Sequence, residues 1–367
     1  MPYAFAHPAQ PDTIRLTLLL AWQPALQNDW LAQHAQGRHI IHCDLSAAHT
    51  LTDEHEHDEH CTSDCDHDHH HTDEHAQAEL ADDIYAPFLN TLGAALAAGA
   101  RDIVIVVAPT TEAVLVEDAL VLAEEEWQAD HPADHFAACN HLLLAADSWL
   151  TDLQQAEFLQ DLGLAADALD DRTVADLLME QVESAAVIEV YMPQLSTPQT
   201  STAQNHKTNQ INLSSLTGLL HALNPGVQIE LPVNLNTANQ FGSDASISSW
   251  HYQSERAFHP QRLWQLIHSD WLTANGTVIR SQGRFLLASQ PTIALQWQHA
   301  GGTCRHADEG EWDTLNTPDQ PSVKPGQDWQ CVGLNLNTQA LATALDACLL
   351  RDDDTQPLDD PFAQIEI

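Results

Sequence analysis

The chain has few basic residues. Only 12 Lys and Arg stand against 53 Asp and Glu in 367 residues, which gives a formal net charge of −41. Two of the twelve are lysines, Lys207 and Lys324. Nucleic-acid binding depends on clustered cations that neutralise phosphates, so this balance argues against a nucleic-acid partner. It argues against an anionic membrane surface for the same reason.

The sequence also lacks a leader and a membrane-spanning run. Residues 1–15 have no basic region followed by an apolar one, as a signal peptide would. The longest apolar runs, such as 16–22 and 103–109, are far shorter than the roughly 20 residues that span a bilayer. We therefore expect a soluble, cytoplasmic protein.

The seven cysteines are too few and too scattered to form a disulfide framework in a chain of this length. Five are expected to be reduced core residues: Cys43, Cys139, Cys304, Cys331 and Cys348. The other two, Cys61 and Cys65, lie in a segment of very different composition.

Apolar runs of strand length alternate with helical patterns in the first part of the chain. The runs cover residues 15–22, 38–43, 102–107, 141–146, 186–192 and 227–231. The helical patterns cover 29–36, 77–98, 111–129 and the long stretch between 146 and 186. This alternation predicts an α/β fold with a mostly parallel sheet and helices on both faces.

The pattern changes after residue 195. Residues 196–212 are rich in Thr, Gln and Asn and are interpreted as a polar insertion. From 245 onward, shorter strands with aromatic residues and two amphipathic helices, at 260–267 and 338–350, predict a smaller α+β domain. We expect the two domains to cover 1–240 and 245–367.

Four motifs of the second domain resemble a known family. They are HYQSERAFHPQRL (251–263), GTVIRSQGRFLLAS (276–289), WQHAGG (297–302) and ALDACLLRDDDTQPLDDPF (344–362). Together they resemble the C-terminal domain of the CobW-like GTPases, and most of all the zinc metallochaperones among them. In the first half, LLMEQV (177–182) and Leu223–Pro225 follow the same family's layout. The resemblance implies a P-loop-GTPase-like sheet, then a CobW C-terminal domain, and a role with metal.

The nucleotide-binding motifs of that family are missing. A Walker A loop needs glycines to wrap the phosphates, a Lys for their charge and a Ser or Thr for magnesium. Residues 21–29, at the end of the first apolar run, contain no glycine. Gln27 fills the Lys position, Asn28 fills the Thr position and Asp29 adds a negative charge. This degenerate loop is represented by Ala21, Gln27, Asn28 and Asp29.

Two further motifs of the family are also replaced. Residues 107–112 (VAPTTE) stand in place of its Glu-x-Ser/Thr-Gly-Leu-Ala stretch, and 190–195 (VYMPQL) in place of its guanine-reading Asn-Lys-x-Asp. We therefore expect no catalytic residue and no bound GTP, and whether the protein is an enzyme stays open, with the motifs weighing against it.

Residues 53–75 form a segment rich in metal ligands, with eight His, ten Asp or Glu and two Cys. Imidazole and thiolate favour zinc, with other divalent transition metals competing. The carboxylates nearby favour protonated imidazoles, so binding should weaken as pH falls. The predicted ligands are His55, His57, His60, Cys61, Cys65, His67, His69, His70, His71 and His75.

Other interpretations stay open for this segment and for a few residues elsewhere. The segment could be a solvated insertion or a pH sensor. His251, Glu255 and His259 could be secondary ligands, although a structural or capping role suits His259 better. His299, Cys304 and His306 form a second loose ligand set. Packing is expected of residues 359–362 and of Trp250, Trp264, Trp271, Trp297 and Trp312.

Three functions are compatible with the sequence. The first is a metal-binding accessory protein, a zinc carrier or buffer that contacts a client metalloprotein. The second is a GTP-dependent zinc metallochaperone with a divergent phosphate loop. The third is an interaction-only regulator that pairs with a true CobW-like GTPase.

Overall fold

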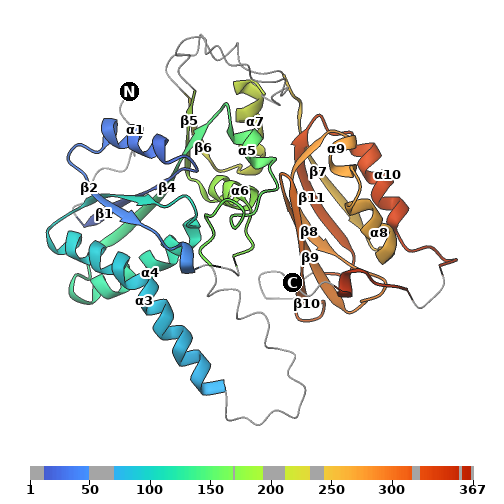
Figure 1. Ribbon diagram of the computed structural model, residues 1–367, viewed down its shortest axis with the longest axis horizontal. Coiled ribbons are helices and arrows are strands. Elements are labelled where there is room, and N and C mark those ends of the chain that lie inside the picture. The colour runs from blue at the N-terminus through green and yellow to red at the C-terminus, as the bar shows by residue number, and fades with distance from the viewer. Residues whose placement is uncertain are drawn as a thin grey trace. The chain divides into compact units, whose positions relative to one another are not determined.

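The computed structural model describes residues 12–48, 70–167, 170–192, 211–231, 244–315, 323–354 and 358–364, and for 70–83 the backbone alone. The chain forms two compact units (Figure 1). The first takes residues 1–149, 157–200 and 226–235, and the second takes 150–156, 201–225 and 236–367.

The first unit is built on a six-stranded sheet in the order β2-β3-β1-β4-β5-β6. Every pairing between these strands is parallel. The central strands are buried almost throughout, as expected where helices cover both faces of a sheet. The strands are β1 (Thr13–Leu20), β2 (His39–Cys43), β3 (Asp102–Val107), β4 (His135–Ala145), β5 (Val187–Tyr191) and β6 (Gln228–Glu230).

Helices lie on both faces of this sheet, and the alternation of side chains along the strands separates the two faces. On one face, Trp30 packs with Leu19, Val104 and Leu143. On the other, Asn140 donates to Glu117 and to the Ser184 carbonyl. The helices of this unit are α1 (Pro24–His34), α3 (His70–Ala97), α4 (Ala113–Asp130) and α6 (Val174–Ser184), with a 3-10 turn at Ser46–Ala48. The short helix α5 (Trp149–Leu153) begins in this unit and belongs mostly to the second.

The second unit is a five-stranded antiparallel sheet in the order β10-β9-β8-β11-β7. Its strands are β7 (Ile247–Ser254), β8 (Thr277–Phe285), β9 (Ile293–Ala300), β10 (Thr303–Glu311) and β11 (Gln327–Leu334). Its helices are α7 (Leu213–Leu223), α8 (Pro260–Ile267), α9 (Trp271–Ala274) and α10 (Thr338–Cys348), and a 3-10 turn follows at Phe362–Gln364.

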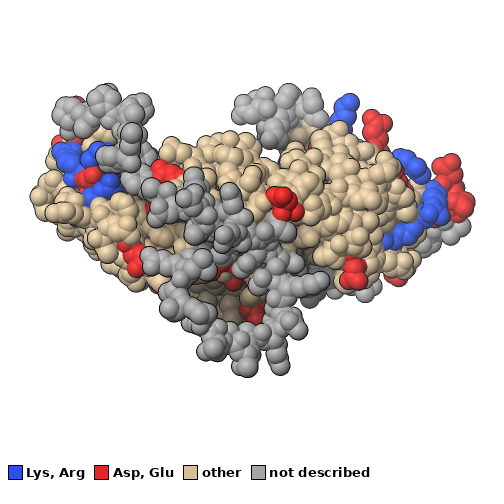
Figure 2. Space-filling model, turned by 90° about the horizontal axis from the view of Figure 1, so that it is seen from above, with Lys and Arg blue, Asp and Glu red and all other residues tan. Residues whose placement is uncertain are grey.

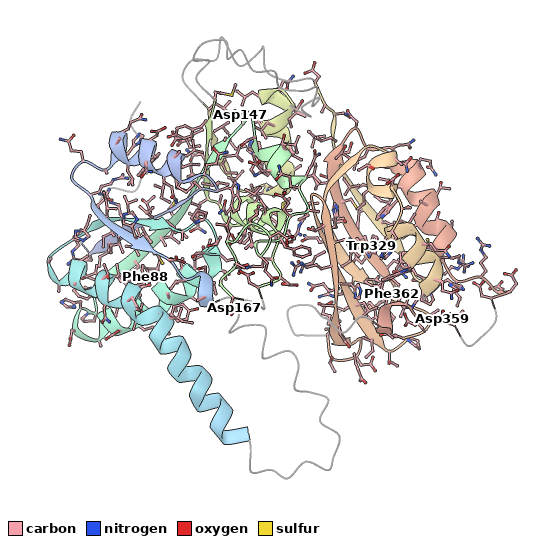
Figure 3. The ribbon with its side chains drawn as sticks, viewed as in Figure 1. Phe88, Asp147, Asp167, Trp329, Asp359 and Phe362 are labelled. Atoms are coloured by element: carbon pink, nitrogen blue, oxygen red, sulfur yellow. The ribbon has the colours of Figure 1, made fainter. Side chains whose placement is uncertain are left out.

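An aromatic core holds the second unit together. Trp329 is fully buried and stacks on Trp297, with ring centroids 4.9 Å apart. Phe362 belongs to the same buried cluster (Figure 3). The prediction of a tryptophan core is confirmed for Trp271, Trp297 and Trp312, which are buried, and for Trp250 and Trp264, which pack against the cluster half-buried.

The α/β architecture predicted from the apolar runs is confirmed, but the long helical stretch between 146 and 186 is wrong. Among the described residues of this stretch the structure has two helices, α5 and α6, with irregular backbone between them. Gly163 adopts a φ of +68°, which a helix does not allow. The Asp170 carboxylate accepts from the Ala166 amide, and such side-chain bonds compete with helical ones.

Some boundaries and burials also differ from expectation. Helix α1 begins at Pro24 rather than at residue 29, because proline suits the first position of a helix. Cys43, Cys331 and Cys348 are buried as predicted, whereas Cys139 is half-buried and Cys304 is exposed. Cys304 lies on β10, an edge strand of its sheet, where fewer neighbours cover a side chain.

On the face drawn in Figure 2, the charged side chains of the described residues are not gathered by sign. On this face, described Lys and Arg side chains lie beside Asp or Glu and form no continuous basic surface. Ion pairs explain part of this, such as Arg15 with Asp102 at 2.8 Å and Arg101 with Asp134 at 2.7 Å. Among the described helices, none is long and apolar enough to cross a bilayer.

Gly283 provides a test of the second sheet. Its φ is +151°, and an added Cβ would clash with the Asp328 carbonyl oxygen on the neighbouring strand. We expect Gly283→Ala to destabilise the protein by at least about 2 kcal/mol, measured by urea unfolding. Gly93→Ala is the matched control: its Cβ meets nothing within 4 Å inside a helix, so it should gain about 0.5–1 kcal/mol. Equal effects of the two substitutions would contradict this account.

Candidate functional site: the turn between β1 and α1

The turn between β1 and α1 lies where the family's phosphate loop would be. It has only three residues, 21–23, because β1 ends at Leu20 and α1 begins at Pro24. Gln23 is the N-cap residue, but its side chain makes no capping hydrogen bond; it donates instead to the Ser148 hydroxyl at 2.7 Å. A turn this short has no glycine, and the Pro24 that follows it has no N–H, so few backbone donors are presented to a phosphate.

Gln27 occupies the position predicted for the phosphate-binding Lys, and its amide is already in use. Its side chain is 5% exposed. The amide nitrogen donates to the Leu19 carbonyl at 2.9 Å and to the Val107 carbonyl at 2.8 Å. Both amide protons therefore tie α1 to the carboxyl ends of β1 and β3, and the side chain points into the sheet rather than toward a ligand.

The other predicted residues of this loop lie in different environments. Ala21 is buried against the sheet, whereas Asn28 and Asp29 are exposed on α1. The structure thus does not gather these residues around one space. The residues present do not fit a nucleoside triphosphate with its magnesium ion, because they supply neither the cation nor a wrapped set of N–H donors.

A polar cluster that the sequence reasoning missed lies beneath α1. The Trp30 indole donates to the Glu189 carboxylate at 3.1 Å, and the His141 Nε2 lies 3.2 Å from the same oxygen. Burial and the neighbouring Glu189 raise the pKa of Tyr191. The cluster fixes α1 to β4 and β5 through side chains rather than through a bound ligand. A charged Glu189 inside an apolar run is the signal that could have revealed it.

The loop after β3 is held by a buried arginine. Arg172 is 2% exposed, and its Nε and Nη2 donate to the two Asp170 carboxylate oxygens at 2.8 and 2.9 Å. It also donates to the Thr110 carbonyl at 3.1 Å and lies 3.4 Å from the Glu112 carboxylate. Burial alone would raise the pKa of Asp170, but hydrogen bonds from Arg172 and from the Ala166 amide outweigh it and hold the pKa at about 2.

The predicted metal ligands fall almost wholly outside the described residues. Within 53–75 only the backbone of 70–75 is described, as the start of α3. In the part of the chain that the structure describes, no three His, Cys, Asp or Glu side chains are placed to hold a metal ion. The following ligands therefore stay predictions: His55, His57, His60, Cys61, Cys65, His67, His69, His70, His71 and His75.

The secondary ligand candidates do not form a site in the described part. His251 pairs with Asp328. His259 is the N-cap residue of α8, as predicted, although its side chain makes no capping bond. Cys304 lies directly opposite His299 on the neighbouring strand, but His299 is buried and Cys304 is exposed. His306 packs edge-on against Phe362 instead, with ring centroids 5.1 Å apart.

Comparison with known proteins identifies the second unit. Residues 247–349 match the family described as "Cobalamin synthesis protein cobW C-terminal domain". These residues form a CobW C-terminal domain. They comprise all five antiparallel strands with α8, α9 and α10.

Part of the chain is also similar to a curated protein. "Zinc-regulated GTPase metalloprotein activator 1" of Dictyostelium discoideum is 25% identical over 194 residues, which cover 45% of this chain. The match covers 38% of that relative's length, so it spans well under half of the relative.

Solved structures of a related type also align with the chain. Zn(II)-bound YjiA GTPase from E. coli is 12% identical with a TM-score of 0.28, over 92% of this chain and 99% of that one. A Zn(II)-bound triple mutant of YjiA GTPase is 11% identical with a TM-score of 0.30, over the same shares of the two chains. At these TM-scores the likeness carries no argument about the site.

Removing the Gln27 amide tests its role in closing the turn. We expect Gln27→Ala to lower the free energy of unfolding by about 2–4 kcal/mol, because it leaves a cavity and takes the donor from two carbonyls in the interior. Gln33→Ala on the same helix is the matched control, since that amide is exposed and makes one bond of 3.2 Å within α1. A loss no larger than in the control would show that the bridge is dispensable.

Proposed function

We propose that this chain is a metal-binding accessory protein with a chaperone-like role. Zinc is the first candidate cargo, and the first unit serves as a scaffold that does not use GTP. The observation that carries the proposal is the bonding of Gln27, whose amide closes the turn after β1 against the sheet.

The geometry of that turn supports the nucleotide-free part of the proposal. Binding a triphosphate would require several negative charges next to the exposed Asp29, with no Lys or Arg in residues 21–34 to offset them. It would also require the Gln27 amide to leave two carbonyls in the protein interior. Both changes oppose binding by kcal/mol amounts.

The ligand chemistry of residues 53–75 supports the metal part. Two thiols and eight imidazoles within 23 residues offer many overlapping four-ligand sets, which suits exchange with a client better than one rigid site. The Dictyostelium relative is named as zinc-regulated and as a metalloprotein activator. We infer that cargo passes to a client metalloprotein by direct contact.

Titration with GTP tests the scaffold. Isothermal calorimetry with GTP and magnesium should show no binding at micromolar concentrations, because the turn lacks the cation and the backbone donors that phosphates need. A CobW-like GTPase with an intact phosphate loop serves as the positive control. Micromolar binding would instead support the alternative of a GTP-dependent metallochaperone with a divergent loop.

Zinc titration of two variants tests whether residues 53–75 bind the metal through their His and Cys side chains or through their negative charge. One variant replaces the eight His and two Cys of 53–75 with Gln and Ser and keeps the acids. Its matched control replaces the ten Asp and Glu with Asn and Gln and keeps the ligands. We expect the first variant to lose bound zinc in metal analysis and the control to retain it, with weaker binding at pH 6 than at pH 8 in the native chain.

The outcomes of the zinc experiment separate the functional candidates. Equal zinc stoichiometry in all three proteins would remove the metal-binding function. If, in addition, a GTPase of the same family co-purified with the chain, the interaction-only regulator would be the better interpretation.

A further inference from the structure

A carboxylate on one helix caps the start of another. Glu180 lies on α6, and its Oε1 accepts the amide of Ala113, the first residue of α4, at 2.9 Å. Glu112 is the N-cap residue of α4, but its side chain makes no capping bond. The first turn of α4 therefore takes its cap from a residue 67 positions along the chain, and this contact joins the two helices.

The surroundings of Glu180 do not favour a negative charge. Its Oε2 is buried and meets no hydrogen-bond partner among the described atoms. The acidic groups that act on it are Glu112 at the start of α4 and Glu117 one turn further on. Strand β4 contributes the neutral Asn140, which donates to Glu117 at 2.6 Å.

The cation that faces Glu112, Arg172, is bonded to other groups. Arg172 is bonded through two nitrogens to Asp170 and through a third to the Thr110 carbonyl, and it faces Glu112. Two further acids lie on the same helix as Glu180. They are Asp176, whose carboxylate accepts the Thr173 amide, and the exposed Glu183. An ionised Glu180 would therefore add a negative charge to a site whose cation, Arg172, is already bonded to other groups.

Burial raises the pKa of Glu180 to about 8, and Glu112 adds to this effect. Bonds from the amides of Ala113 and Val114 work in the opposite direction and are too weak to cancel it. The side chain thus carries a proton near neutral pH while it still accepts the Ala113 amide.

We propose that Glu180 is a proton-operated latch: its neutral carboxyl holds α6 against the first turn of α4, and loss of the proton releases loop 108–112. The loop is the part that can respond. It is anchored by Arg172 at Thr110, by Gln181 at the Pro109 carbonyl, and by the α4 cap that Glu180 supplies.

Release of loop 108–112 would also affect the residues that follow β2, because Thr111 contacts them. The Thr111 hydroxyl accepts the Leu45 amide at 2.9 Å and lies 3.5 Å from Asp44. The predicted metal-binding segment begins at residue 53, a few residues further along. The latch itself does not depend on metal binding, so its test uses the metal-free protein.

The direction of the pH dependence follows from the two states of Glu180. In the unfolded chain the carboxyl titrates near its ordinary pKa of 4.5, and in the folded protein near 8. Between these values the folded state holds the proton and the unfolded state does not. Stability from this group is therefore complete below pH 4.5 and falls as the pH rises toward 8.

The Glu180→Gln variant keeps the acceptor oxygen and removes the titration. We expect the unfolding equilibrium constant of the native chain to rise between pH 5 and pH 8 by at least about tenfold more than that of the variant. Glu183→Gln, on the exposed side of the same helix, is the matched control and should keep the native pH dependence. Identical pH profiles for the native chain and Glu180→Gln would overturn the proposal.

Hydrogen exchange in the native chain gives a second measurement that needs no variant of Glu180. After correction for intrinsic rates, the peptide covering 108–116 should lose protection above pH 8, while a peptide from the centre of α6 retains it. Constant protection of 108–116 from pH 6 to pH 9 would overturn the latch even if Glu180→Gln failed to fold.

Discussion

The two hydrogen bonds from the Gln27 amide are the interaction on which the first unit depends. They join the first helix to the carboxyl ends of β1 and β3, two neighbouring strands inside the parallel sheet. Parallel strands direct their last carbonyls to one edge, where loops and ligands commonly supply the donors. Here a side chain of the protein supplies them. The edge that binds phosphates in a P-loop protein is thereby part of the folded core.

The small number of basic residues governs how buried charges are compensated in this chain. With 12 cations for 53 anions, the buried Arg172 is committed to Asp170 and the loop after β3. A buried ion pair of this kind contributes little net stability when intact, but loss of one partner is costly because it leaves an unpaired charge. Glu180 shows the other solution, in which an acid without a cation of its own keeps a proton.

Local sequence patterns predicted the elements that are buried uniformly along their length. The run 102–107 is strand β3 with the same bounds, because a strand buried on both faces is apolar at every position. The helical stretch between 146 and 186 was predicted wrongly, because its apolar residues serve an irregular segment whose turns depend on Gly163 and Asp170. For the candidate site, the missing glycines and lysine could be read from the sequence. Glu189 inside an apolar run signals a buried polar group, but its partners Trp30 and His141 are found only in the structure.

The sequence by itself determined the acidity, the metal-ligand composition of 53–75, the CobW-like motifs of the second unit and the absence of a P-loop, because each of these is a property of neighbouring residues. Only the tertiary structure decided which contacts the turn after β1 makes and which acids share a site. Gln27 meets Val107 across 80 positions and Glu180 meets Ala113 across 67. The physical reason is that hydrogen bonding and the cost of burying a charge depend on neighbours in space, and parallel crossover connections bring together residues that are far apart in the chain.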